Sequence, residues 1–165
     1  MEQSIALLNR GVADELWAVH QYMYFHFHCD DQGYDLLAGI FKRTSIQEML
    51  HVEEFAERIL FLGGEVELAP SHPVAKIHDV REMLVKAVEM EKAAVRDYNR
   101  YAQECAQNLD AASKKVFEDL VLDEELHGDH FETQLMHLDR FGEQYLALQS
   151  MERSRNIAAG PPSEG

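Results

Sequence analysis

The chain is poor in basic residues. Its 165 residues include 15 Lys and Arg against 30 Asp and Glu, which gives a formal net charge of −15. Nucleic-acid binding depends on clustered Lys and Arg that neutralise phosphates, so this balance argues against a nucleic-acid partner. An acidic surface attracts cations, but the same charge also serves simply to keep a protein soluble. The charge alone therefore leaves the function open.

Cysteines are scarce, and long apolar runs are missing. Cys29 and Cys105 form no C-x-x-C pair, which argues against a zinc or redox motif and leaves a single disulfide open. No apolar run approaches the roughly 20 residues that a membrane span needs, and the first ten residues lack the pattern of a signal peptide. We therefore expect a cytoplasmic protein with no membrane partner.

Proline and glycine are also few, at four and nine residues, so long uninterrupted helices are allowed. Apolar residues recur at spacings of three and four, which is the period of a helix with one buried face. This period predicts four long helices, over residues 4–29, 36–62, 80–106 and 111–141. Strand-like alternation does not compete with it, and the predicted fold class is all-α.

The breaks between these segments predict how the helices connect. Gly63 and Gly64 are a stop signal for the second helix, and Asp79 is suited to cap the start of the third. Residues 65–78 contain two prolines and form the one long connection. We therefore expect a four-helix bundle with a long crossover between helices two and three.

The C-terminal end differs in sequence pattern from the four long predicted helices. Gly142 ends the fourth helix, and a short amphipathic piece over residues 143–151 predicts a fifth helix. The last residues, rich in Gly and Pro, are typical of a disordered tail. We assign residues 1–153 to a single helical domain and residues 154–165 to the tail.

Each of the four predicted long helices carries a short polar motif. Two helices have a Glu and a His three residues apart, so that both side chains lie on one side of the helix. The other two have a Glu and, seven residues on, a Tyr. The four pairs are Glu48 with His51, Glu124 with His127, Glu15 with Tyr22, and Glu91 with Tyr98.

These motifs form an internal repeat of a helix pair. Glu15 precedes Glu48 by 33 residues, and Glu91 precedes Glu124 by the same 33. One shift of 76 residues carries all four residue types of the first half onto the second. Two facing copies of such a pair bring four Glu and two His to one centre.

A buried group of four carboxylates needs a cation, because uncompensated buried charge is very costly. The alternative is a set of surface glutamates and satisfied histidines, which a single E-x-x-H would favour but four matched motifs do not. Carboxylates with few imidazoles suit iron or manganese. We expect Glu48 and Glu124 to bridge two ions, with Glu15 and Glu91 binding terminally and each His supplying one nitrogen.

In its motifs the sequence resembles the bacterioferritins. The resemblance rests on residues 9–22, 45–51, 57–63 and 123–127, and it covers nearly the whole chain except the tail. It implies a ferritin-like di-iron domain with two iron ions per subunit. The implied ferroxidase ligands are Glu15, Glu48, His51, Glu91, Glu124 and His127. Glu89 competes with Glu91, which we prefer because it keeps the 33-residue spacing.

Two further residues have a predicted role with an open alternative. Tyr22 either hydrogen-bonds a ligand or supplies an electron, or it is a buried packing residue. The resemblance implies a haem shared between two subunits, with Met49 as its axial ligand. Met49 follows Glu48 by one residue and so points about 100° away from the metal face. The alternative is that Met49 packs at an apolar dimer interface.

The function implied by the resemblance is iron storage and detoxification. A ferroxidase oxidises Fe(II) with dioxygen or hydrogen peroxide, and the mineral collects in a hollow homo-oligomer, for which we expect 24 subunits built from dimers. A ferredoxin-type reductant is the expected partner for iron release. Three alternatives stay open: a Dps-like twelve-subunit mini-ferritin, a rubrerythrin-like peroxide scavenger, and a helical scaffold without metal.

Overall fold

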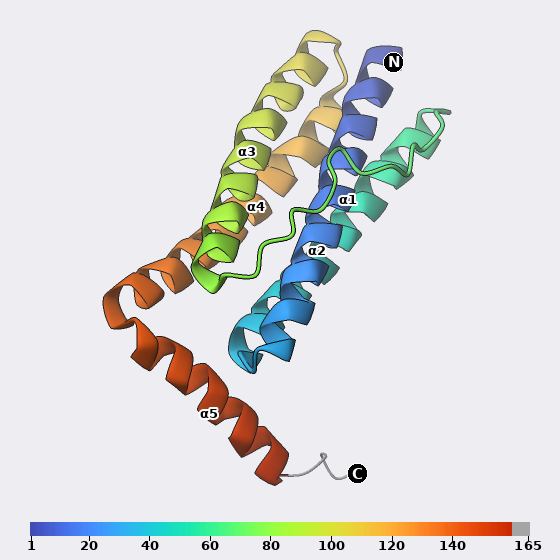
Figure 1. Cartoon of the computed structure of the whole chain (residues 1–165). Helices are drawn as coiled ribbons and strands as arrows, with labels where there is room; N and C mark the ends of the chain where they lie inside the picture. The colour runs from blue at the N-terminus through green and yellow to red at the C-terminus, as the bar shows by residue number, and fades with distance from the viewer. Residues whose placement is uncertain (160–165) are drawn as a thin grey trace.

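The computed structural model describes residues 1–159, and these residues form five helices (Figure 1). The helices are α1 (Glu2–Asp31), α2 (Asp35–Phe61), α3 (Val80–Gln107), α4 (Ala111–Phe141) and α5 (Glu143–Ala159). The described residues contain no strand. The all-α prediction is therefore confirmed, and the four long helices begin and end within a few residues of the predicted bounds.

The four long helices form two antiparallel pairs, α1 with α2 and α3 with α4 (Figure 1). Turns of a few residues join the helices within each pair, whereas residues 62–79 run along the bundle from the end of α2 to the start of α3. This long return makes α3 parallel to α2. The predicted connectivity, with one long crossover after the second helix, is thus confirmed.

Local chemistry sets several helix ends. The side chain of Asp79 accepts a hydrogen bond from the backbone N–H of Glu82 at 2.9 Å, which satisfies one of the free donors of the first turn of α3. Asp110 does the same for α4 through the N–H of Ser113, at 3.0 Å. Gly142 has a φ of +52°, a conformation that glycine adopts at little cost, and α4 ends there.

The apolar core is divided into two clusters along the bundle. One contains Phe25, Phe41 and Phe131, and the other contains Phe55 and Phe117, all with no exposed surface. Tyr22 of the first cluster and Tyr98 of the second each donate a hydrogen bond to a buried Glu, so a polar centre lies between the two clusters. The fold therefore surrounds a polar centre with packed aromatic side chains, which hold the backbone around it rigid.

Helix α5 extends further than the sequence suggested. It continues to Ala159 instead of ending near residue 151, because residues 143–159 contain no Gly or Pro to stop it. Figure 1 shows α5 leaving the bundle at the end of α4. The Gln149 side chain accepts a hydrogen bond from the backbone N–H of Leu37 at 2.9 Å. Residues 154–159 of the predicted tail are thus helical, and residues 160–165 lie outside the described residues. The domain division stays a prediction.

Two expectations from composition can be compared with the fold. Cys29 and Cys105 are both free and buried, so the disulfide that the sequence left open is not formed. None of the helices in residues 1–159 combines the length and the apolar character that crossing a membrane demands. The cytoplasmic location stays a prediction.

Candidate metal centre

The six predicted ligands meet at the middle of the bundle. Glu15 comes from α1 and Glu91 from α3, while α2 and α4 each supply a Glu and a His from their E-x-x-H motifs. All six residues are at most 4% exposed. Glu89 is exposed, which supports the preference for Glu91 over its neighbour.

The six residues form two overlapping groups in which the ligand atoms lie within 4.8 Å of one another. The first group is Glu15, Glu48, His51 and Glu124; the second is Glu48, Glu91, Glu124 and His127. Glu48 and Glu124 belong to both groups, whereas Glu15 and Glu91 each belong to one. This geometry suits two cations that share the two central carboxylates, as expected from the sequence.

The side-chain nitrogen and oxygen atoms of the four central residues lie close to one another. His51 Nδ1 lies 2.9 Å from Glu48 Oε2 and 3.1 Å from Glu124 Oε1, and His127 Nδ1 lies 3.1 Å from Glu48 Oε1. Among the described residues, both oxygens of Glu48, one oxygen of Glu124 and the Nδ1 atoms of both histidines have no hydrogen-bond partner of good geometry. Buried polar atoms are rarely left in this state, and a pair of divalent cations would satisfy all five.

Two tyrosines support the terminal carboxylates across the bundle. The Tyr22 hydroxyl donates to Glu91 Oε1, and the Tyr98 hydroxyl donates to Glu15 Oε1 at 2.5 Å. Each bond thus joins the two halves of the repeat. Tyr22 thus contacts one of the ligand candidates, and its role at the site stays a prediction. Tyr98 was not among the predicted site residues, although the repeat pairs it with Tyr22.

Burial keeps both phenols neutral. Burial and the neighbouring Glu91 carboxylate raise the pKa of Tyr22 well above its ordinary value, and burial and Glu15 do the same for the pKa of Tyr98. A neutral phenol retains its proton and can donate it in a hydrogen bond to a carboxylate. Each tyrosine therefore fixes the orientation of one terminal Glu.

Asp123 is a second contact that the sequence did not reveal. Its carboxylate Oδ2 lies 3.3 Å from Nε2 of His51, on the side of the ring opposite Nδ1. A carboxylate at this position holds a ligating imidazole in one orientation and leaves the other nitrogen for metal. The repeat gives Gln47 as its counterpart, so only the first half of the centre has this charged contact. A hint of this contact in the sequence is that Asp123 directly precedes Glu124.

When no cation is bound, the buried carboxyl and imidazole groups of the centre hold protons between them. Burial and the Glu48 carboxylate raise the pKa of Glu15 to about 7, and burial and the Glu124 carboxylate raise the pKa of Glu91 well above its ordinary value. Burial opposes the charge on His127, but contacts with Glu124 and Glu48 outweigh it and raise the pKa of the imidazole to about 11. Metal binding at this centre therefore has to displace protons.

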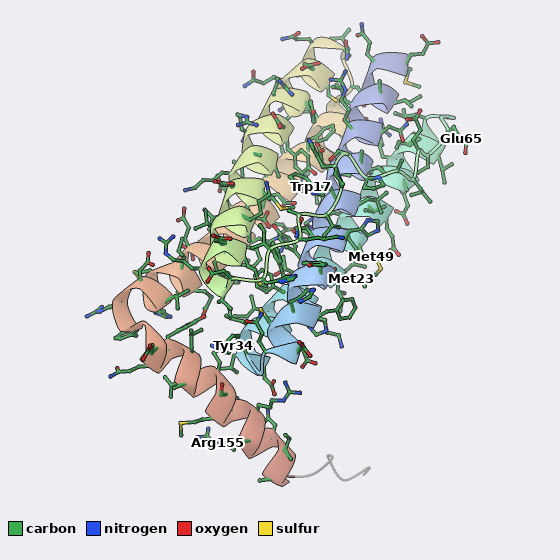
Figure 2. The ribbon with its side chains drawn as sticks, viewed as in Figure 1. Trp17, Met23, Tyr34, Met49, Glu65 and Arg155 are labelled. Carbon is green, nitrogen blue, oxygen red and sulfur yellow. The ribbon has the colours of Figure 1, made fainter. Side chains whose placement is uncertain are left out.

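Met49 lies away from this centre, on the outer side of the α1–α2 pair. Its side chain is 46% exposed, and Met23 on α1 and Ile46 on α2 are 41% and 48% exposed. Figure 2 labels Met23 on α1 and Met49 on α2. The predicted surface position is confirmed, and the haem-ligand role stays a prediction.

The comparisons with known proteins agree with this arrangement. A family model described as "Ferritin-like domain" matches residues 5–141. The chain is 34% identical to a protein named bacterioferritin from Desulfovibrio desulfuricans, over 98% of this chain and 86% of that protein. It is 37% identical to the bacterioferritin of Rhodobacter capsulatus, over 87% of this chain and 89% of the relative. The chain is 35% identical to the bacterioferritin of Brucella melitensis, over 97% of this chain and 94% of that protein.

Proposed function

The chain belongs to the ferritin-like family and, within it, to the bacterioferritins, and from this premise we propose that it oxidises Fe(II) and stores the Fe(III) product. The observation that carries the proposal is the set of five buried polar atoms without hydrogen-bond partners, which belong to Glu48, Glu124, His51 and His127. A metal-free role as a scaffold gives no reason to bury them in this state, because each orphaned polar atom costs roughly 1–3 kcal/mol.

In this proposal iron is the substrate, and two Fe(II) ions give up one electron each to dioxygen or hydrogen peroxide. Glu48 and Glu124 lie in both ligand groups and hold the two ions close together. His51 and His127 each present Nδ1 to the centre, while Tyr22 and Tyr98 keep the terminal carboxylates in place. Protons leave the carboxyl groups and imidazoles as Fe(II) binds. The carboxylates can then stabilise the extra positive charge that oxidation adds.

The proposal includes a hollow homo-oligomer in which the oxidised iron collects as mineral. The name bacterioferritin of the curated relatives and their similarity over nearly the whole chain support this assembly. Native mass distinguishes a shell of 24 subunits from a Dps-like shell of twelve. A haem bound through Met49 from each of two subunits is the second part of the proposal, supported by the exposed apolar surface at Met23, Ile46 and Met49.

The test is aerobic titration of metal-free protein with Fe(II), followed by the absorbance of Fe(III). We expect a fast phase that saturates near two irons per chain, then slower mineral growth. Glu48→Ala and Glu124→Ala remove the shared carboxylates and should abolish the fast phase. Glu89→Ala is the matched control, since Glu89 is an exposed neighbour of Glu91 on the same helix.

Two results would contradict the proposal. A fast phase that survives in the Glu48→Ala/Glu124→Ala double variant would exclude this centre as the site of oxidation. A wild-type rate no faster than that of buffer with either dioxygen or hydrogen peroxide would exclude a ferroxidase and favour the metal-free scaffold instead.

A further inference from the structure

The two ligand groups of the centre are built alike. Each combines one terminal Glu and one His with the shared pair Glu48 and Glu124. The rings of His51 and His127 lie nearly parallel, at 22°, with their centroids 5.8 Å apart. Both rings present Nδ1 to Glu48, at 2.9 and 3.1 Å. The ligands themselves therefore give no reason for one group to bind a cation more tightly than the other.

The difference between the two groups lies behind the imidazoles. On the side of the ring opposite Nδ1, Nε2 of His51 lies 3.3 Å from Oδ2 of Asp123. Within residues 1–159, the ion pairs of His127 all involve Nδ1, the atom that faces the centre. The 76-residue shift places Gln47, which carries no charge, at the position that corresponds to Asp123. One half of the centre thus has a carboxylate behind its imidazole, and the other half has none.

The Asp123 carboxylate can act on a bound cation through the His51 ring. When Nδ1 of a neutral imidazole binds a cation, the proton of the ring is on Nε2, which here is the atom next to Asp123. A carboxylate at this position fixes the tautomer and the orientation of the ring, and it makes the ligating nitrogen more basic. Loss of such a partner typically lowers metal affinity by about 10–100-fold.

The exposure of Asp123 sets the size of the expected effect. Its side chain is 56% exposed, so water and salt screen its charge. We therefore expect the lower end of the range, about a tenfold difference in affinity between the two groups. At that ratio, about nine in ten of the chains that hold a single cation hold it in the group of His51.

We propose that Asp123 makes the two halves of the centre unequal, so that the first divalent cation binds to the group of Glu15 and His51 and the second to the group of Glu91 and His127. Asp123 is then a positioning residue that acts through His51. The proposal rests on the proposed function, because it assumes that the six-residue centre binds two cations.

The test measures each group by itself. Two cations repel each other, so even two equal groups fill in two steps, and a titration of the wild-type chain does not assign them. Glu91→Ala leaves the first group complete, and Glu15→Ala leaves the second. Each metal-free variant is titrated with Co(II) alone at one fixed pH, followed by the visible absorbance of the bound ion. We expect Glu91→Ala to bind one Co(II) about tenfold more tightly than Glu15→Ala does.

Asp123→Asn is then added to each of these variants. It should weaken Co(II) binding by about tenfold in Glu91→Ala and by less than about twofold in Glu15→Ala, because only the first group contains His51. A variant that merely loosened the fold would weaken both groups. The matched control is Asp129→Asn, which removes the charge of another exposed Asp on α4 and should change neither group by more than about twofold.

A second measurement needs no change to a ligand. When Asp123→Asn is made in the otherwise wild-type chain, only the tighter of the two groups should become weaker. The first Co(II) should then bind about fivefold more weakly and the second less than about twofold more weakly, as follows when one of two unequal groups loses a tenfold advantage. This measurement decides the question if either Glu→Ala variant fails to fold or to bind Co(II).

The outcomes separate the inequality from the centre itself. Equal affinities in Glu91→Ala and Glu15→Ala, or an equal loss in both when Asp123→Asn is added, would overturn the inequality. Two Co(II) bound per wild-type chain would in that case leave the metal centre intact. A wild-type protein that binds no Co(II) would contradict the metal centre, and the role of Asp123 with it.

Discussion

The burial of Glu15 makes a measurable prediction about the metal-free protein. Burial and Glu48 raise the pKa of Glu15 from 4.5 to about 7, so the folded state holds this proton more tightly than the unfolded state does. Between these two pKa values the folded protein binds more protons, and its free energy of unfolding therefore falls as pH rises. At about 1.4 kcal/mol per pKa unit, ionising Glu15 costs the metal-free fold about 3 kcal/mol. Most of this cost arises between pH 5 and pH 8.

The perturbation that isolates this cost is Glu15→Gln. Glutamine has nearly the same size, keeps a carbonyl that accepts the hydrogen bond from Tyr98, and carries no proton to lose. In the presence of a chelator, we expect the variant to gain about 2–3 kcal/mol relative to wild type when pH is raised from 5 to 8. The same variant should bind Co(II) more weakly, because it removes a terminal carboxylate.

The assay is denaturant unfolding at both pH values and at one matched protein concentration, since assembly contributes to the stability of an oligomer. Glu89→Gln is the control, because an exposed Glu on α3 should change stability by less than about 0.5 kcal/mol at either pH. A Glu15→Gln variant that loses stability relative to wild type as pH rises would refute the argument. Such a result would mean that Glu15 is held as an ion in the metal-free fold.

Three further predictions concern other parts of the chain. Phe41→Ala empties a fully buried position in one aromatic cluster and should lower the free energy of unfolding by about 3–5 kcal/mol in a denaturant titration. For Asp110, burial is outweighed by hydrogen bonds from Ser113 and Arg58, and the pKa of its carboxyl falls to about 2. Asp110→Ala should therefore cost about 1–3 kcal/mol at neutral pH and lose its effect as pH falls through 2, because the folded pKa is the lower one. Met49→Leu should abolish the haem absorbance of protein reconstituted with haem and leave Fe(II) oxidation unchanged; a bound haem in this variant would exclude Met49 as its ligand.

The sequence determined the features that depend on neighbours along the chain. Apolar spacing predicts the four long helices, and Asp79 caps α3 because an N-cap acts only on its own first turn. The two E-x-x-H motifs and the 76-residue repeat were enough to single out all six residues that meet at the centre. A ligand pair three residues apart on one helix can be read locally, since helix geometry alone sets its direction.

Tertiary structure decided the contacts that cross between helices. The sequence pairs Tyr22 with Glu15 on one helix, but its hydroxyl donates to Glu91, because side chains meet across the bundle according to how the helices pack. Likewise His51 meets Asp123 of α4 only through this packing. Gly128 of α4 likewise faces Glu91 of α3 only through helix packing, since a Cβ atom there would lie 3.4 Å from Cβ of Glu91.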